Sequence, residues 1–584
     1  MYLKELKLQR FRSCEETTIS FNSDLTVLVG ENNGGKSNII DAIRLLTLPL
    51  NGRRERYAEK EDLRKGSSVK DFRIQGSFLG LSDTLKGLLI SAVVDPTTDK
   101  AVIGMKHEIE APDSVRGRTT FWAGKYETSE PEAGSTNLIR HVYLPALRDA
   151  QYALGSGSPT RITTLLEHFL NDGEEESFVA GAQRNQMPHR VITEVNTQIG
   201  SALEDLSGGL RPQTASLGFS SETLLDVARD LRFKLADSGM DPAEIRFSGL
   251  GYANLLYMAT VIVELAKARE ADLTLFLVEE PEAHLHPQLQ MLVLEFLLGQ
   301  AKKSEQQPLV SGKPEGRIQI IVTTHSPNLT AWVQPEHLVV IRSQKDTSTS
   351  PETYKTAAIS ISQLGLKLST RRKVSRYLDV TRSALLFGNR TMLVEGIAEA
   401  ILIPVIARYI VLKGDREAFR RFQGSVIVPI DGVDFKPYVE VLLRSHGGAC
   451  IADRLVVVTD GDPSVPGNRK TELESLATGF NSTGALSVFT NDVTLEHALF
   501  AAGNEDLLKN SFLALHPRSE NDWSTSITNF AEAGRPGVFL KLLAEKRTRK
   551  GDLIQQISER ISRRPQLFQV PPYLKNAIRE LSRA

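Results

Sequence analysis

The chain has 584 residues, of which 41% are hydrophobic and 24% are charged, so it has an ordinary globular composition and the length of roughly three or four domains. Its 70 Lys and Arg residues balance 71 Asp and Glu residues, and this near-zero net charge provides no global attraction to nucleic acid. Cys14 and Cys450 have no CxxC partner, which excludes a disulfide framework and a cysteine-based zinc site and favours a reducing cytosol.

The N-terminus and the internal apolar stretches do not have the pattern of export or membrane segments. Charged residues interrupt the apolar ones throughout MYLKELKLQRFR, so we expect no secretory signal. The nearest candidate for a membrane span, residues 400–412, is shorter than the ~18 to 20 apolar residues required and contains Pro404 and Arg408. We therefore expect a cytoplasmic protein without a membrane partner.

The N-terminal residues predict strands followed by a glycine-rich turn and a helix. Leu3, Leu6 and Leu8 and then residues 17–21 have a strand pattern, residues 25–29 are an apolar run, and residues 38–46 have the helical period. Between the last two, GENNGGKS fits GxxxxGK[ST] in the strand-to-helix context of a phosphate-binding loop.

This loop predicts an ATP site. We expect backbone amides and the helix N-terminus to hold the phosphates, Lys36 to reach the β- and γ-phosphates, and the Ser37 hydroxyl to bind Mg²⁺. The residues predicted to bind nucleotide in this loop are Gly30, Asn33, Gly34, Gly35, Lys36 and Ser37.

The composition changes after the first 150 residues. Residues 162–170 and 221–235 have helical, heptad-like patterns, and polar turns separate them. We predict a helical insertion over 151–240, used for dimerisation, which splits an ATPase domain into parts 1–150 and 241–370. Strand-like runs return at 273–278, 318–322 and 338–341, and residues 343–353 are expected to form a loop.

Two carboxylates end the predicted strand in LTLFLVEEP, residues 273–281, as in a Walker B segment. Glu279 would sit beside the metal of the nucleotide, where Asp is the usual residue, and Glu280 would polarise the attacking water. One predicted strand later His325 is placed to contact the γ-phosphate, although a histidine taken alone is more often a surface or core residue.

The order of these elements resembles the ABC ATPase heads of the structural-maintenance and recombination-repair families, over residues 1–150 and 241–345. In those families two heads sandwich ATP, and a signature loop makes the contact in trans. FSGLGY, residues 247–252, is the candidate loop, with Ser248, Gly249 and Gly251 expected to face a γ-phosphate although Leu250 departs from the LSGG pattern.

After a helical linker, predicted at 371–389, strand and helix signals alternate from residue 390, which indicates a second α/β domain with a mainly parallel sheet. Glu395 ends the first strand, Glu399 follows one helical turn later, and a later strand ends in Asp460 and Asp462. Oxygen ligands at strand ends suit Mg²⁺ or Mn²⁺ and the two-metal hydrolysis of a phosphodiester.

This pattern resembles the Toprim domain, and Thr494-Leu495-Glu496 and Lys550-Gly551-Asp552 resemble the overcoming-lysogenization-defect (OLD) nuclease family, which includes Gabija-type nucleases. The resemblance implies that Glu496 joins the metal ligands and that Lys550 stabilises charge at the scissile phosphate. Taken singly, each acidic residue is also compatible with a solvated loop position. Leu144-Pro145-Ala146-Leu147-Arg148-Asp149 is also similar to the family, with no chemical role assigned.

Residues 541–584 contain eleven Lys and Arg against four Asp and Glu. This local excess is compatible with phosphate binding and equally with a solvated helix face.

We therefore predict an α/β protein in which a split ABC-type P-loop ATPase head with a helical insertion precedes a Toprim domain at 390–584. The resemblance implies an ATP-binding, metal-dependent endonuclease that cuts double-stranded DNA, self-associates as a dimer or tetramer and serves prokaryotic defence against phage, with a helicase or other defence protein as a possible partner. The alternative is a non-nucleolytic structural ATPase of DNA repair. A topoisomerase or primase would need a strand-passing tyrosine setting or zinc-binding cysteines, and the sequence offers neither.

Overall fold

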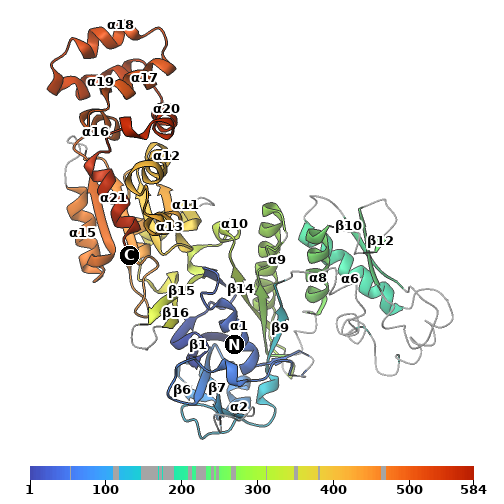
Figure 1. Cartoon of the computed structure of the whole chain (residues 1–584). Coiled ribbons are helices and arrows are strands. Elements are labelled where there is room, and N and C mark those ends of the chain that lie inside the picture. The colour runs from blue at the N-terminus through green and yellow to red at the C-terminus, as the bar shows by residue number, and fades with distance from the viewer. Residues whose placement is uncertain are drawn as a thin grey trace. The chain divides into compact units, whose positions relative to one another are not determined.

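The computed structural model describes residues 1–50, 52, 54–95, 97–109, 117–146, 169, 174, 190–207, 213–218, 232–237, 243–244, 249–264, 271–283, 285–310, 312–346, 353–378, 382–461 and 468–584. The chain forms two compact units, residues 1–361 (the N-terminal unit) and 362–584 (the C-terminal unit). Both combine sheets with helices, so the predicted α/β class is confirmed (Figure 1).

The main sheet of the N-terminal unit has seven described strands in the order β16-β15-β3-β14-β13-β9-β4. All neighbours pair in parallel except β15 and β16. These strands are β3 (Leu25–Gly30), β4 (Leu48–Pro49), β9 (Ile139–Leu144), β13 (Leu273–Glu279), β14 (Arg317–Thr324), β15 (Leu338–Asp346) and β16 (Thr353–Ser360). Strand β3 is buried along its whole length, which explains its uninterrupted apolar sequence.

A second sheet of the N-terminal unit is antiparallel and larger than the strand pair expected from the sequence. Its order is β2-β1-β5-β7-β6, and β8 also pairs with β7. The strands are β1 (Tyr2–Phe11), β2 (Cys14–Ser20), β5 (Asp71–Leu79), β6 (Val93–Asp95), β7 (Lys100–Ile109) and β8 (Gly117–Ala123).

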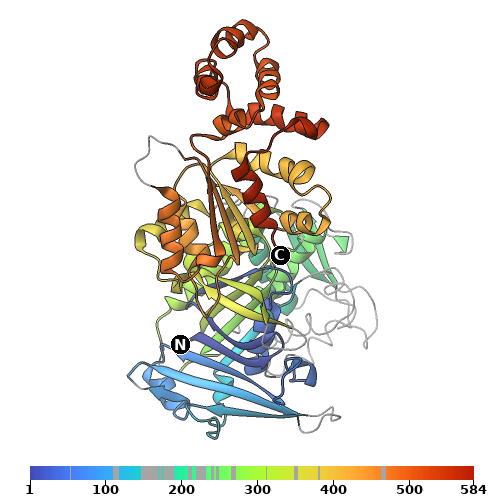
Figure 2. The ribbon, with the colours of Figure 1, turned by 60° about the vertical axis from the view of Figure 1, so that its left-hand side comes forward.

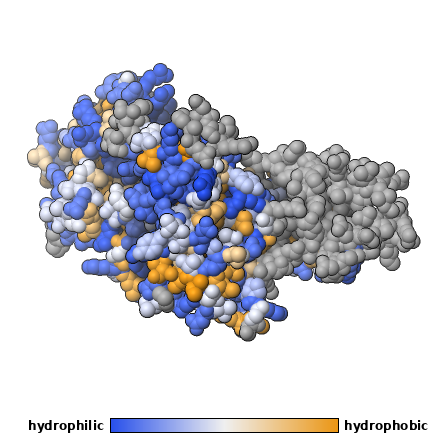
Figure 3. Space-filling view, turned by 90° about the horizontal axis from the view of Figure 1, so that it is seen from below, coloured by the Kyte–Doolittle hydropathy of each residue, from blue (hydrophilic) through white to orange (hydrophobic). Residues whose placement is uncertain are grey.

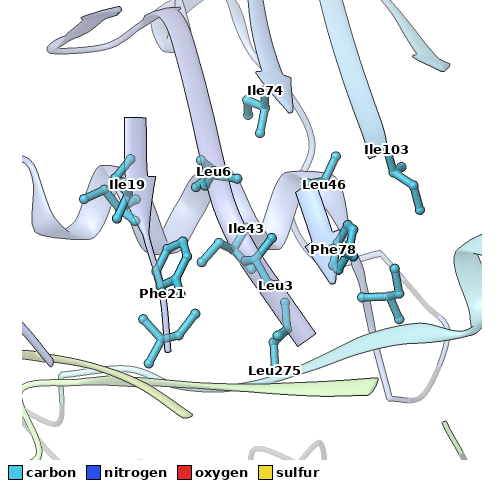
Figure 4. Packing of buried hydrophobic residues seen from close by; sticks show 14 of the residues in the cluster. Leu3, Leu6, Ile19, Phe21, Ile43, Leu46, Ile74, Phe78, Ile103 and Leu275 are labelled. Atoms are coloured by element: carbon cyan, nitrogen blue, oxygen red, sulfur yellow. The ribbon is translucent and has the colours of Figure 1, made fainter. Parts of the chain in front are cut away.

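Helix α1 (Lys36–Leu46) joins these two sheets through a shared core. Ile39, Ile43 and Leu46 recur at helical spacing and are buried. In Figure 4, Ile43 and Leu46 lie among side chains of the antiparallel sheet, such as Leu3 and Phe78, and near Leu275 of β13. This packing fixes the helix that follows the phosphate-binding loop.

Within 151–240 the described residues include a helix and strands. Helix α6 (Arg190–Ser207) lies in this range, whereas the helix expected at 162–170 falls, apart from residue 169, outside the described residues. However, β10 (Gln213–Gly218) and β11 (Arg232–Asp237) pair in an antiparallel way, and β12 (Ala243–Glu244) extends this sheet. The helical prediction for 221–235 is therefore wrong at 232–235, where apolar and charged residues alternate with the period of a strand.

The predicted loop over 343–353 also begins later than expected. Strand β15 continues to Asp346, where it pairs with Thr353 at the start of β16. Further helices of this unit are α2 (Asp83–Leu88), α8 (Leu250–Glu264), α9 (Pro287–Glu305) and α10 (Pro327–Ala331). No helix in the described part of the chain is long and apolar enough to cross a membrane.

Exposed apolar side chains of the N-terminal unit include Leu88, Ile90 and Val94, at the end of α2 and in β6. Figure 3 shows one face of the protein, on which hydrophobic side chains gather in places among hydrophilic ones. These three residues are not among those predicted to bind nucleotide or metal.

The C-terminal unit is built on a parallel sheet with the order β18-β17-β19-β20. Helices lie on both sides of these strands in Figure 2. The strands are β17 (Arg390–Val394), β18 (Val426–Pro429), β19 (Arg454–Thr459) and β20 (Leu486–Thr490). The helices are α11 (Leu368–Tyr377), α12 (Ile397–Ile406), α13 (Arg416–Gln423), α14 (Lys436–Leu443), α15 (Arg469–Gly479), α16 (Leu495–Ala501), α17 (Glu505–Leu515), α18 (Glu520–Trp523), α19 (Arg535–Glu545), α20 (Lys550–Arg563) and α21 (Pro572–Ser582).

The core of this unit continues from the sheet into the C-terminal helices. Met392 and Val456 of the sheet belong to the same buried cluster as helical residues of α20 and α21. Within the cluster Trp523 is 1% exposed and packs against Phe512 and Phe539, with ring centroids 5.7 and 5.6 Å away. The helices after β20 therefore form one packed body with the sheet.

Candidate nucleotide site and candidate metal site

The predicted phosphate-binding loop lies between β3 and α1, as expected. Gly30 has φ +148°, and a Cβ there would lie 2.1 Å from the carbonyl oxygen of Ile341 on the neighbouring β15. Gly35 has φ +107°, and a Cβ there would lie 2.3 Å from Thr356 Oγ1 of β16. Glycine is therefore required at both positions by the backbone and by the neighbouring strands.

Lys36 is buried at the centre of this loop. Its ammonium group donates hydrogen bonds to the carbonyl oxygens of Gly30, at 2.9 Å, and Glu31, at 2.8 Å. Burial lowers the pKa of Lys36 to about 8, against the opposing effect of nearby carboxylates, of which Glu280 is the strongest. Lys36 therefore stays mostly charged at pH 7 but loses its proton at lower pH than an ordinary lysine, and carbonyl oxygens of the loop hold its ammonium group.

Glu279 is the last residue of β13, and its side chain contacts Ser37 at the end of the phosphate-binding loop. Burial raises the pKa of Glu279, and a hydrogen bond with Ser37 opposes this shift. The hydroxyl of Tyr143, at the end of the adjacent strand β9, donates to Glu279 Oε2 at 3.3 Å, and the Arg44 guanidinium stacks 3.8 Å from the centre of the tyrosine ring. Glu279 stands where Asp is usual, and a residue of the neighbouring strand β9 holds its longer side chain by a hydrogen bond to the carboxylate.

The structure brings Lys36, His325 and Glu280 together in a chain of contacts. His325 Nδ1 lies 3.4 Å from Lys36 Nζ, and His325 Nε2 lies 3.4 Å from Glu280 Oε1. Burial and then the charge of Lys36 lower the pKa of His325, which favours a neutral ring that accepts at Nδ1 and donates at Nε2. The predicted water-polarising and γ-phosphate-contacting residues therefore lie side by side.

Glu282, which the sequence reasoning missed, fixes the position of His325. Its Oε1 accepts hydrogen bonds from the His325 backbone N–H at 2.8 Å and from the Thr324 hydroxyl at 2.7 Å. Its position in the sequence could have identified Glu282 as a candidate, because it follows the two predicted carboxylates closely, in the turn after the same strand.

The candidate signature loop is placed only in part. Gly249 and Gly251 lie at the start of α8, where a helix was expected, while Ser248 lies outside the described residues. Asn254 of this helix donates to the carbonyl oxygen of Ala283 at 2.7 Å, which ties α8 to the segment after the two carboxylates.

In the C-terminal unit, four of the five predicted metal ligands lie in the described residues. Glu395 follows β17, Asp460 follows β19, and the parallel register of these adjacent strands places both at the same edge of the sheet. Glu399 lies in the first turn of α12 and Glu496 in the first turn of α16. Asp462 falls in residues 462–467, outside the described residues.

The Glu395 carboxylate is held by a dense set of donors. Its Oε1 accepts from the backbone N–H of Asp460 at 2.8 Å, from the guanidinium of Arg469 at 2.7 Å and from the Thr459 hydroxyl. Arg469 is the first residue of α15. The sequence did not predict it at this site, because it neither ends an apolar strand nor belongs to a recognisable motif.

Asp460 is held from the other side by Asn491, which follows β20. The Asn491 amide donates to Asp460 Oδ1 at 2.6 Å, and its oxygen accepts from the backbone N–H of Gly461 at 3.1 Å. The Asn491 amide also lies 3.3 Å from the hydroxyl of Tyr573 on α21. Asn491 could have been inferred from its position after the fourth parallel strand, whereas Tyr573 could not.

Glu496 is 1% exposed, and among the described residues its carboxylate oxygens have no polar partner other than Lys550. Lys550 Nζ, at the start of α20, forms an ion pair with Glu496 Oε2 at 3.1 Å. Burial, the largest single effect, lowers the pKa of Lys550, but the charge and hydrogen bond of Glu496 together with the charges of Asp460 and Glu399 outweigh it, so the pKa is raised. The predicted catalytic lysine and the predicted fifth ligand are therefore adjacent.

Like charges accumulate among these carboxylates. Burial, then the neighbouring carboxylates Asp460, Glu496 and Glu395, raise the pKa of Glu399 to about 7. Burial and the charge of Glu395 likewise raise the pKa of Asp460 to about 6, although the Asn491 hydrogen bond opposes the shift.

The donor chemistry of this edge fits a divalent cation. A hard cation would offer a partner to the buried Glu496 Oε1 and would relieve the repulsion between the neighbouring acids. Among the described residues, however, no three His, Cys, Asp or Glu side chains are already arranged as a complete metal site.

The comparisons with known proteins first define a class. The AAA ATPase domain family matches residues 1–115 and 241–330, so an ATPase domain is present and is split in the sequence by the residues between. This supports ATP binding by the N-terminal unit and confirms the predicted split ATPase head.

Relatives that cover most of the chain are more specific. The Old nuclease of Escherichia phage P2 is 24% identical over 450 residues, which cover 70% of this chain and 70% of that protein. The OLD nuclease of Thermus scotoductus is 22% identical, over 68% and 72%, and Endonuclease GajA of Bacillus cereus is 21% identical, over 75% and 72% of the two chains. The resemblance to OLD nucleases predicted from the sequence is confirmed.

Proposed function

We propose that this protein is an ATP-regulated, divalent-metal-dependent DNA endonuclease. The edge of the parallel sheet in the C-terminal unit carries the proposal. There Glu395 and Asp460 lie at the ends of adjacent strands, while the buried Glu496 forms an ion pair with the exposed cation Lys550. A binding module would not require buried acids at this edge, and acids without a cation would repel DNA.

The proposed division of labour follows the sequence prediction. Residues 1–150 and 241–370 form the ATPase head, 151–240 the dimerisation insertion, 371–389 the linker and 390–584 a Toprim nuclease domain. Mg²⁺ or Mn²⁺ at the Toprim site would supply Lewis-acid stabilisation of the attacking and leaving oxygens of a phosphodiester. Glu395, Glu399, Asp460, Asp462 and Glu496 are the proposed ligands.

The described residues contribute to this chemistry in distinct ways. Asn491 holds the Asp460 carboxylate and the following amide, which fixes the direction of one proposed ligand. Lys550 places a positive charge beside Glu496, where it would stabilise charge that develops on the scissile phosphate.

In the N-terminal unit, Lys36 and Ser37 would hold the phosphates and Mg²⁺ of ATP. Glu279 would contact the same ion, and Glu280 and His325 would orient water at the γ-phosphate. We also propose that Ser248, Gly249 and Gly251 contact the nucleotide of a second copy, so that ATP controls a dimer or tetramer. From the family resemblance in the sequence we further propose a role in prokaryotic defence against phage, with a helicase or other defence protein as a candidate partner.

Cleavage of supercoiled plasmid with Mg²⁺ or Mn²⁺ tests the proposal. We expect nicked or linear product from the parent protein and none from Asp460→Asn. The matched control is Asp453→Asn, which changes an exposed aspartate at the opposite end of β19 and should leave cleavage intact. Lys36→Ala, with and without ATP, shows the direction of nucleotide control.

If the folded parent protein cuts under none of these conditions, or if Asp460→Asn cuts as well as the parent protein, the nuclease proposal is wrong. The structural DNA-repair ATPase would then be favoured.

A further inference from the structure

Arg469 connects the ends of two neighbouring strands in the C-terminal unit. One nitrogen of its guanidinium, Nη1, donates to Glu395 Oε1 at 2.7 Å and to the carbonyl oxygen of Asp460 at 3.1 Å. The same nitrogen contacts the Thr459 hydroxyl. The side chains of Arg469 and Glu395 are only 17% and 19% exposed, so this ion pair is largely shielded from solvent.

The described hydrogen bonds to the Glu395 side chain all reach one oxygen of its carboxylate. Glu395 Oε1 receives the Arg469 guanidinium, the Thr459 hydroxyl and the backbone N–H of Asp460. Among the described residues no hydrogen bond reaches Glu395 Oε2. The carboxylate is therefore fixed in orientation and has one oxygen available.

The charge of Arg469 matters because Glu395 belongs to a crowded set of acids. The charge of Glu395 acts on both Glu399 and Asp460 and makes each harder to ionise. A charged, hydrogen-bonded partner such as Arg469 restricts a carboxylate in such a set to one orientation.

We propose that Arg469 is a positioning residue for the metal of the nuclease site: it fixes the Glu395 carboxylate through Oε1 and so leaves Oε2 for the divalent cation. This inference rests on the proposed function. Groups that orient a metal ligand typically contribute about 10- to 100-fold to metal affinity.

Binding of Mn²⁺ to the full-length protein, without nucleotide or DNA, tests the inference by electron paramagnetic resonance of free Mn²⁺. We expect Arg469→Gln to weaken the Asp460-dependent binding by at least about 10-fold. Because a single nitrogen makes the three contacts, the ammonium of Arg469→Lys can replace it in part, and we expect an intermediate loss of about threefold.

Arg454→Gln is the matched control. Arg454 begins the strand that ends next to Asp460, and it donates to the carbonyl oxygens of Glu580 and Arg583 at 2.9 and 3.0 Å. It thus has a structural role at the opposite end of β19, and its loss should leave Mn²⁺ affinity unchanged while lowering the melting temperature.

Unchanged or tighter Mn²⁺ binding in a folded Arg469→Gln would overturn the inference. If that variant does not fold, Arg469→Lys decides, and a Mn²⁺ affinity equal to that of the parent protein overturns it. A parent protein whose Mn²⁺ binding is not reduced by Asp460→Asn contradicts the proposed metal site itself, and the inference with it. If Asp460→Asn loses Mn²⁺ binding while Arg469→Gln binds Mn²⁺ as well as the parent protein does, the metal site stands and only the role of Arg469 is contradicted.

Discussion

Replacing Glu399 by Gln should stabilise the metal-free protein at high pH. The pKa of Glu399 is raised from 4.5 to about 7 by burial and by neighbouring carboxylates. A carboxyl group whose pKa is higher in the folded than in the unfolded protein reduces stability as pH rises from about 4.5 to about 7. At ~1.4 kcal/mol for each pH unit between the two pKa values, ionised Glu399 costs about 3 kcal/mol above pH 7.

The substitution is nearly isosteric and keeps a local contact. Glu399 Oε2 accepts a hydrogen bond from the Gly396 backbone N–H at 3.2 Å, and the amide oxygen of glutamine can accept the same bond. Glu399→Gln should therefore unfold at higher urea concentration than the parent protein at pH 8 in EDTA, and at the same concentration at pH 4.5.

Urea unfolding of the two proteins at both pH values measures this difference. Glu474→Gln, which changes a half-exposed glutamate on α15, is the control and should show no difference that depends on pH. Addition of Mn²⁺ at pH 8 should stabilise the parent protein more than Glu399→Gln. Equal stability of parent and Glu399→Gln at pH 8 in EDTA would refute the argument that the acidic cluster opposes folding when no cation is bound.

Three further predictions follow from single features. Because the pKa of Lys36 is about 8, ATP affinity measured by a fluorescent nucleotide should fall as pH rises through 8, and a constant affinity to pH 9 would contradict the role of its charge. Arg547 and Arg549 are exposed beside Lys550 and lack an ion-pair partner among the described residues, so replacing each by Ala should reduce the slope of log Kobs against log[salt] for DNA binding by about one. The same change at Arg563, at the opposite end of α20, should leave the slope unaltered. Trp523→Ala should destabilise the C-terminal unit by about 3 to 5 kcal/mol in urea unfolding, because it empties a buried aromatic cluster.

Local patterns in the sequence predicted the parts of each site that lie on one continuous segment. The loop between residues 30 and 37, the carboxylates Glu279 and Glu280 and the acids Glu395 and Asp460 all follow apolar strands, and the structure places each at a strand end. Apolar periodicity is a property of neighbouring residues, so it can be read without knowledge of the fold. The helical prediction for 232–235 was wrong because a short segment with alternating polarity is decided by the strand with which it pairs.

The partners of these residues depended on the tertiary structure. The strand order β18-β17-β19-β20 places Asp460 beside Glu395, and only then do Arg469 and Asn491 come into contact with the two carboxylates. Tyr143 supports Glu279 because β9 lies beside β13, although 136 residues separate the two side chains in the sequence. The sequence by itself determined which chemical groups stand at strand ends, whereas the order and register of the strands determined which of them meet, since such contacts join residues far apart in the chain and leave no local pattern.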